Sequence, residues 1–177
     1  QKTRQLIDIK SVFGEKATFK TNESWPEDIR INATVTFTDG TDILTADFKF
    51  FVPIASVESV ETPYSIGSNL LIPMLLDVKD AGIYRIRSNL FSQAGLPVAV
   101  LTSEKRLEIG SDIMELKVHK SVFSGHNGPF DLRDIQVEKM SAFPGDKLKH
   151  GVGKKSVFKL DSFNLDMLSD DKYQPTE

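Results

Sequence analysis

The stretch Ile31-Asn32-Ala33-Thr34-Val35-Thr36-Phe37-Thr38-Asp39-Gly40 alternates apolar and polar side chains. This period of two is what a half-buried β-strand requires, and Gly40 tolerates the positive φ of a tight turn. The alternation resumes after the turn, with Ala46, Phe48, Phe50 and Val52 on one face. Pro53 then ends the strand, because proline has no N–H to donate to a ladder. The sequence therefore predicts a β-hairpin that ends at Val52.

Strand-like runs separated by turn residues continue beyond the hairpin. They are expected at residues 70–78, 83–91, 98–102, 106–109, 113–122, 130–140 and 157–168. No apolar repeat of 3.6 persists for three turns, so helices longer than a turn or two are not expected. Strands spaced at about 8–12 residues are typical of a sandwich or barrel. We therefore expect an all-β protein built as an antiparallel sandwich.

Two strands of this series change the face on which their apolar residues lie. Phe130 and Leu132 share one parity, whereas Ile135 and Val137 share the other, which predicts a bulge near Arg133-Asp134. A similar switch in the last strand predicts a second bulge or bend near Ser162.

Composition excludes several classes of function. The 177 residues carry 22 Lys plus Arg against 25 Asp plus Glu, a net charge of −3 that argues against nucleic-acid binding. There is no cysteine, which removes disulfides, thiol catalysis and cysteine-ligated metals. The longest apolar stretch, residues 70–76, contains Pro73 and is too short to span a bilayer. No signal peptide is recognisable, and we interpret the chain as a mature protein or an excised fragment.

Several short motifs carry a family resemblance. They are Asp77-Val78-Lys79-Asp80-Ala81-Gly82-Ile83-Tyr84-Arg85-Ile86, Ala94-Gly95-Leu96-Pro97-Val98-Ala99, Leu107-Glu108-Ile109-Gly110 and Gly128-Pro129-Phe130-Asp131-Leu132-Arg133-Asp134-Ile135. Their order resembles the immunoglobulin-like domains found near the ends of bacterial exported proteins. It is similar in particular to the C-terminal part of an uncharacterised bacterial family known only as a domain of unknown function.

The resemblance implies an immunoglobulin-like β-sandwich domain over residues 55–177. Residues 1–54 would then form a smaller β-unit, or the end of a preceding sandwich, because they are too few for a seven-strand domain of about 100 residues. It also implies a non-catalytic module that is secreted or periplasmic. Such a module would act as a spacer, an adhesion element or an accessory binding domain, with a protein or an envelope or host surface as its partner.

The alternative is a hydrolase, or an accessory domain of one, that uses loop carboxylates around Asp131, Asp134 and His126. The sequence has no Gly-x-Ser-x-Gly elbow to support it. His119, His126 and His150 lack any spacing that would arrange a metal site. The stretch Gly151-Val152-Gly153-Lys154-Lys155-Ser156 superficially resembles a phosphate-binding loop, but it lacks the required spacing and precedes a strand.

Acidic loops offer a possible calcium site without any EF-hand pattern. The candidate ligands are three pairs of carboxylates: Asp39 and Asp42, Asp77 and Asp80, Asp131 and Asp134. Asp39 and Asp80 also suit tight turns, whose local hydrogen bonds favour aspartate. No other cofactor is expected.

Aromatic residues outside the expected core offer a possible binding face. They are Trp25, Phe51, Tyr64 and Phe143. Carbohydrate binding through Trp25 or Tyr64 is a further alternative. The competing interpretations are caps over a sandwich end for Trp25 and Phe143, and a contact between two β-units for Phe51.

Overall fold

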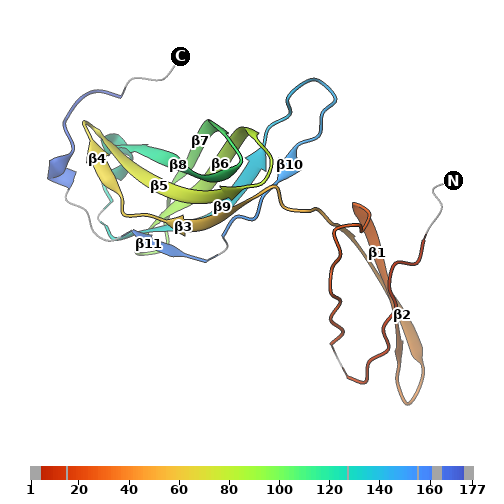
Figure 1. Ribbon diagram of the computed structural model, residues 1–177. Coiled ribbons are helices and arrows are strands. Elements are labelled where there is room, and N and C mark those ends of the chain that lie inside the picture. Colours follow the sequence, from red (N-terminus) through yellow and green to blue (C-terminus); the bar gives the residue numbers. More distant parts are fainter. Residues whose placement is uncertain (1–4, 15, 127, 155, 161–164, 174–177) are drawn as a thin grey trace. The chain divides into compact units, whose positions relative to one another are not determined.

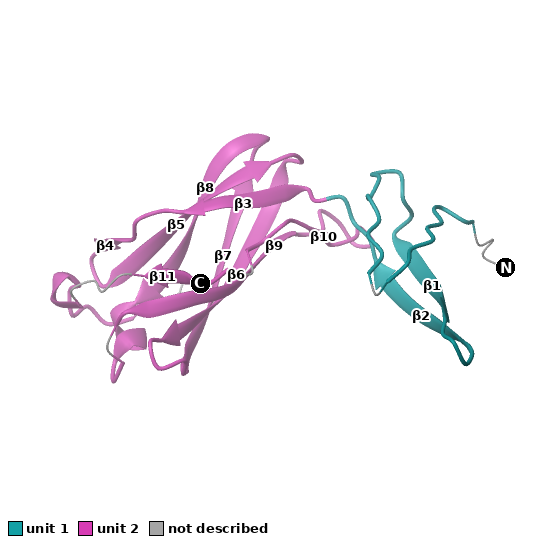
Figure 2. Ribbon diagram, turned by 90° about the horizontal axis from the view of Figure 1, so that it is seen from below, with its two compact units in different colours: residues 1–52 teal, residues 53–177 magenta. Residues whose placement is uncertain are grey.

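The computed structural model describes residues 5–14, 16–126, 128–154, 156–160 and 165–173. The chain separates into two compact units, unit 1 with residues 1–52 and unit 2 with residues 53–177 (Figure 2). This boundary lies two residues before the position expected from the sequence. Each unit is described by itself.

Unit 1 contains the predicted hairpin. Strand β1 (Asp28–Thr36) pairs antiparallel with β2 (Thr41–Lys49), from Thr36 opposite Thr41 to Asp28 opposite Lys49. In the turn, the Phe37 N–H donates to the Gly40 carbonyl at 2.8 Å. The expectation that the second strand reaches Val52 is wrong. Its last backbone bond runs from the Phe50 N–H to the Glu27 carbonyl, just before β1 begins.

Unit 2 contains two antiparallel sheets. In the first, β5 (Asn69–Val78) is central, with β3 (Ala55–Val60) and β4 (Tyr64–Ile66) along one edge and β8 (Gly110–His119) along the other. In the second, β6 (Gly82–Ser92) lies between β7 (Pro97–Leu107) and β9 (Phe130–Lys139). The short strands β10 (Lys149–His150) and β11 (Phe158–Leu160) both pair with β9. The predicted all-β, antiparallel class is confirmed (Figure 1).

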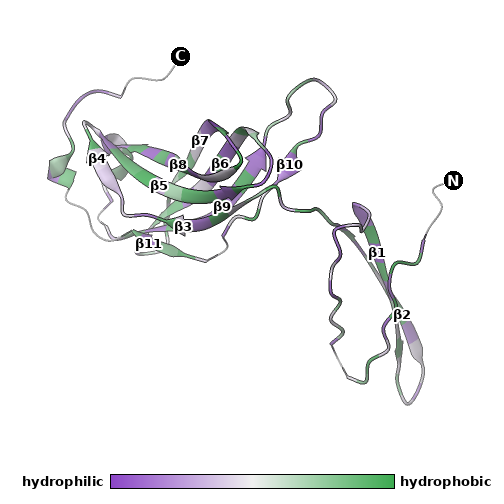
Figure 3. Cartoon of the chain, viewed as in Figure 1, coloured by the Kyte–Doolittle hydropathy of each residue, from purple (hydrophilic) through white to green (hydrophobic). Residues whose placement is uncertain are grey.

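The core of unit 2 lies between these sheets. Alternate residues of β5 and β8 pack against alternate residues of β6 and β9, and Figure 3 shows how apolar β5 is along its length. Each buried aliphatic or aromatic side chain contributes about 1.5–3 kcal/mol relative to an exposed one. The largest fully buried side chains come from both sheets and from the 3-10 turn after β8: Ile72, Met74, Leu76, Tyr84, Ile86, Leu90, Leu107, Met114, Leu116, Phe123, Phe130 and Leu132.

The segment 151–154 joins the two sheets along one side of the sandwich. Val152 forms a parallel bridge with Ser56 of β3, in which the Val57 N–H donates to the Val152 carbonyl at 3.0 Å. On its other side, the Gly151 N–H donates to the Val137 carbonyl of β9 at 2.9 Å. The backbone of this segment therefore serves as a strand-like link, which explains the glycines of the stretch that superficially resembles a phosphate-binding loop.

The predicted bulge in β9 is confirmed. The pairing of β6 with β9 shifts register between Arg87 and Asn89, and Asp134 adopts a φ of +55°. The buried Ser88 hydroxyl donates to the Arg133 carbonyl at 3.0 Å, so this carbonyl has a hydrogen-bond partner at the bulge. As a result, Ile135 and Val137 return to the core face. Ser162 lies outside the described residues.

Two other expectations concern element boundaries. The separate strands expected at 98–102 and 106–109 form one strand, β7, because β6 pairs with it continuously from Gly82 to Leu90 before one register shift. Among the described residues the only helical turns are the 3-10 turns η1 (Lys120–Phe123) and η2 (Leu165–Met167), as the missing helical period predicted. None of the described helices has the length and apolar character needed to cross a membrane.

Candidate functional site

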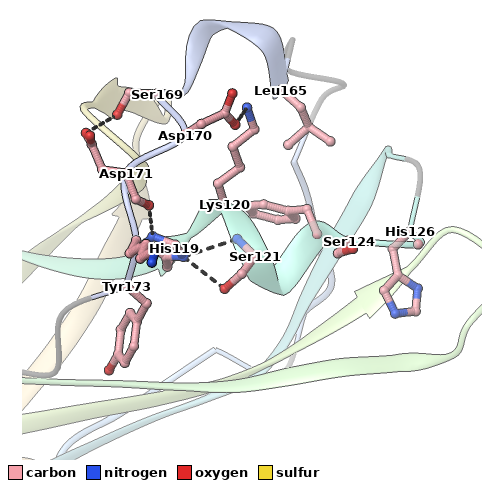
Figure 4. A pocket seen from close by; sticks show the side chains of 13 residues that line it. His119, Lys120, Ser121, Ser124, His126, Leu165, Ser169, Asp170, Asp171 and Tyr173 are labelled. Atoms are coloured by element: carbon pink, nitrogen blue, oxygen red, sulfur yellow. Dashed lines mark hydrogen bonds and ion pairs between the residues drawn. The ribbon is translucent and has the colours of Figure 1, made fainter.

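A cavity of about 570 Å³ lies at the end of β8 in unit 2. It is lined by residues 119–121 and 123–126, which comprise the last residue of β8, most of η1 and the following loop, together with Leu165 and residues 169–173 (Figure 4). Residues 165–173 are called the C-terminal strap below.

The C-terminal strap is fastened to the sandwich by one apolar anchor and several polar contacts. Leu168 is 3% exposed and belongs to the core. The Lys120 ammonium donates to the Leu168 carbonyl at 3.0 Å and to the Asp170 carboxylate at 2.7 Å. The Ser169 N–H donates to the Gly67 carbonyl at 2.9 Å. The Lys120 contact holds the pKa of the Asp170 carboxyl below its ordinary value.

His119 is the N-cap of η1 and also contacts the strap. Its Nδ1 accepts from the Ser121 N–H at 3.2 Å and lies 2.9 Å from the Ser121 hydroxyl. Its Nε2 lies 3.1 Å from the Asp171 carbonyl, which can only accept, so Nε2 carries the proton. The Tyr173 ring meets the imidazole edge-on at 5.3 Å between centroids. This geometry uses both nitrogens of a neutral imidazole in opposite roles.

The cavity contains His126 but neither carboxylate of the hydrolase hypothesis. Asp131 accepts from Arg133 Nη2 at 2.9 Å, and Asp134 accepts from Asn89 Nδ2 at 3.2 Å. Figure 4 shows the His126 ring set apart from His119, beyond η1. This cavity therefore does not bring His126 together with Asp131 or Asp134.

The six carboxylates of the calcium hypothesis form three pairs, which are distributed over both units. Asp39 and Asp42 belong to unit 1, and the other four belong to unit 2. Asp80 accepts from Lys139 at 2.8 Å and from Lys149 at 3.0 Å, and these bonds lower its pKa. Asp77 lies near the end of β5, opposite Ser56 and Ser111. Within the described part of the chain no three His, Asp or Glu side chains are grouped so that they could hold a metal ion.

Two of the four candidate aromatic residues belong to each unit. In unit 1, Trp25 packs against Phe50 with 5.8 Å between ring centroids, and Phe51 is half exposed. In unit 2, the Tyr64 hydroxyl donates to Glu115, and this bond raises the pKa of the phenol. Phe143 is exposed in the loop between β9 and β10, at the opposite end of unit 2 from β4 (Figure 1). Tyr64 and Phe143 therefore do not form one binding platform.

The feature that sequence reasoning missed is the exposure of an apolar face on the β1–β2 hairpin. This face, called the hairpin face below, pairs Ile29 with Phe48, Ile31 with Ala46, and Ala33 with Leu44. Leu44 is 62% exposed and Ile31 and Phe48 are each 40% exposed, whereas Ile29 is buried and Ala33 and Val35 are half-buried. The expected half-buried strand is therefore correct for β1 except at Ile31, and it is wrong for β2, whose residues are all exposed. The alternation of apolar and polar residues predicts which side chains share a face, but it does not indicate whether that face is covered.

The opposite face of the hairpin is mainly polar. Arg30 forms a bidentate ion pair with Asp47, with distances of 2.6 and 2.8 Å, and Lys49 pairs with Asp28. Beyond them, Asn32 accepts from the Thr45 hydroxyl at 3.1 Å, and Ile43 is the apolar exception at 72% exposed. The hairpin is therefore amphipathic, with its ion pairs and its hairpin face on opposite sides.

The chain is similar in structure to a solved protein of the DUF4785 family from Legionella pneumophila. The TM-score is 0.46 with 17% sequence identity, over 78% of this chain and 36% of that protein. The chain thus spans about a third of that protein's length. No protein-family model matches the sequence, and no curated protein matches it.

Proposed function

We propose that this chain is a non-catalytic, immunoglobulin-like module of a bacterial exported or envelope protein. In this proposal unit 2 is the spacer, and the β1–β2 hairpin is the adhesion or accessory binding element. The single observation that carries the proposal is the exposed hairpin face, with Leu44 and Phe48 outward on a strand whose other face carries ion pairs.

The strand order of unit 2 supports the immunoglobulin-like assignment. The sheet β3–β5–β8 has the order of the first, second and fifth strands of such a domain, and β6–β9–β10 has the order of the third, sixth and seventh strands. The fourth strand, β7, pairs with β6 and not with β8, which is the place of the added edge strand in variable-type domains. The parallel bridge between Ser56 and Val152 links the first strand to the segment after β10, as expected where the first strand approaches the last.

Elementary energetics support a binding role for the hairpin. A two-stranded hairpin is at best marginally stable in water, because it has no second layer against which to bury apolar area. Contiguous exposed apolar surface in a soluble protein commonly marks an interaction site. A partner that covers Ile31, Leu44 and Phe48 would therefore add the burial that the described residues of unit 1 do not supply.

The test compares two variants of the full chain. Leu44→Thr/Phe48→Thr removes apolar surface from the hairpin face while keeping residues that favour strands. Ile43→Thr is the matched control, because it removes a comparably exposed apolar side chain from the opposite face of the same strand. Saturable binding to bacterial envelope fractions and to host-surface extracts is measured by biolayer interferometry.

We expect the wild type and Ile43→Thr to bind alike and the double variant to bind at least about tenfold more weakly, which corresponds to 1.4 kcal/mol. Wild-type chain that engages neither preparation would overturn the binding role. Equal losses in both variants would show that the hairpin face is not the contact surface. Circular dichroism of each variant checks that unit 2 retains its strands.

A further inference from the structure

The polar contacts around His119 depend on its protonation state. In the neutral imidazole, Nδ1 accepts from the Ser121 N–H while Nε2 donates to the Asp171 carbonyl. A second proton on Nδ1 would face the Ser121 N–H at 3.2 Å, and two donors cannot share a hydrogen bond. The Ser121 hydroxyl can rotate so that its oxygen accepts a hydrogen bond from a protonated Nδ1. The Ser121 backbone N–H, in contrast, can only donate.

The imidazole is rigid, so the two contacts cannot adjust independently. Turning the ring to relieve the clash at Nδ1 carries Nε2 away from the Asp171 carbonyl and disturbs the edge contact with Tyr173. The Leu168 anchor and the Lys120 contacts do not involve the ring. Protonation therefore acts on the last described part of the strap, residues 171–173, rather than on its buried anchor.

We propose that His119 is a pH-sensitive latch, which holds residues 171–173 of the C-terminal strap against the cavity when neutral and releases them when protonated. Histidine suits this role because it is the side chain that ordinarily changes charge between about pH 5 and pH 8. Release opens the side of the cavity formed by the strap. The latch is independent of the hairpin face, so it can be correct or wrong whatever the hairpin binds.

Among the described residues of the strap, the two carboxylates next to His119 in the cavity lining each accept from another group. Asp170 is already paired with Lys120, and the Asp171 carboxylate accepts from the Ser169 hydroxyl. The titratable and charged groups that line the cavity with His119 are Lys120 of η1, His126 from the loop after η1, and Asp170, Asp171, Lys172 and Tyr173 from the strap. The same elements also carry Asp112, Glu115 and Lys117 on β8 and Asp166 on η2. The residue opposite His119 on β5 is the neutral Asn69.

The test follows the full chain by nuclear magnetic resonance across the histidine titration range. The ¹⁵N shifts of the His119 ring report the tautomer, and hydrogen exchange of the Ser121 amide, corrected for intrinsic rates, reports the N-cap bond. We expect the Nε2–H tautomer at neutral pH. On acidification, the protection of the Ser121 amide against hydrogen exchange should fall about threefold to tenfold, the range expected for the loss of one net hydrogen bond. The fall should share its midpoint with the His119 ring and with shift changes at Asp171 and Tyr173.

Two variants separate the latch from general acid effects. His119→Asn keeps a side-chain acceptor at the N-cap but cannot take up the proton, so Ser121 protection should become independent of pH. His126→Gln should keep the wild-type transition. The proposal is overturned by an Nδ1–H tautomer at neutral pH, by a transition that persists in His119→Asn, or by wild-type protection that stays constant while His119 titrates. If His119→Asn does not fold, the wild-type ring and amide midpoints still decide the question.

Discussion

Replacing Gly153 by alanine should destabilise unit 2 more than any other single-methyl addition at its described glycines with negative φ. A Cβ built on Gly153 lies 1.7 Å from the Ile135 carbonyl oxygen and 2.7 Å from its carbon, whereas real Cβ contacts are essentially never under 3.0 Å. The obstruction is backbone, so it cannot swing aside. The segment also cannot retreat without lengthening the bonds from Ile135 N–H to the Lys154 carbonyl and from Val57 N–H to the Val152 carbonyl.

The expected magnitude follows from these two costs. Overpacking typically costs about 1–3 kcal/mol. Each of two weakened backbone bonds adds about 0.5–1.5 kcal/mol. We therefore expect Gly153→Ala to lower the free energy of unfolding by about 2–6 kcal/mol, a large part of the roughly 5–15 kcal/mol of an ordinary domain.

The assay is urea unfolding of the full chain, followed by resolved amide signals of unit 2. Gly82→Ala is the graded control. Its Cβ would lie 2.4 Å from Lys139 Cε, the end of a flexible side chain that can move, so we expect a loss below about 1 kcal/mol. Gly40→Ala in unit 1 meets nothing within 4 Å and should leave unit 2 unchanged. A Gly153→Ala midpoint equal to that of Gly82→Ala would refute the proposed link between β3 and β9.

Three further predictions concern charge and backbone conformation in unit 2. Burial raises the pKa of Tyr84 from 10.0 to about 12, so the unfolded chain loses the phenol proton first. The free energy of unfolding should therefore fall by about 2 kcal/mol from pH 10 to pH 12, relative to Tyr84→Phe measured alongside by urea titration. The Asp134→Gly variant should be more stable to urea than Asp134→Ala by about 1 kcal/mol. Both variants lose the carboxylate, but only glycine adopts a φ of +55° without cost. Equal urea midpoints of the two variants would contradict this. Hydrogen bonds from Lys139 and Lys149 lower the pKa of Asp80, so its stabilising effect is complete above its ordinary pKa of 3.8 and is lost as pH falls through the lower folded value. Asp80→Asn should thus flatten the acid side of the urea-midpoint profile, and high salt should shrink the difference from wild type because the carboxylate is partly exposed.

The alternation of apolar and polar residues predicts those features of the fold that depend on which side chains share a face of a strand. The hairpin and the bulge at Asp134 are both predicted correctly, because a period of two reports which side chains share a face. The expected positive φ at Gly40 is wrong, since the strands are joined by the four-residue loop 37–40 and Gly40 is not among the glycines with positive φ. The end of β2 was placed too late, since a strand ends where its partner ends and not only where a proline follows.

The contacts that shape the cavity could not be predicted in the same way. His119 contacts Asp171 across 52 positions of the chain, and through a backbone carbonyl that every residue possesses. The glycines at 151 and 153 are conspicuous in the sequence, but their reason is the distant Ala55 and Ile135 carbonyls. Such contacts cannot be recognised from residue type or spacing. Sequence analysis therefore assigns no function to His119.

The contrast between the hairpin and β5 shows what decides burial once a strand has formed. Both contain apolar residues at alternate positions, yet Leu70, Ile72 and Met74 are almost fully buried whereas Leu44 and Phe48 are exposed. The difference is the facing sheet, in which β6 and β9 supply the second layer that β5 requires. Alternation thus predicts that one face of a strand has to be buried against a second layer. In unit 1 the described residues do not supply that layer for Leu44 and Phe48. In the proposed binding role, a strand or sheet of the partner would cover this exposed face of the hairpin.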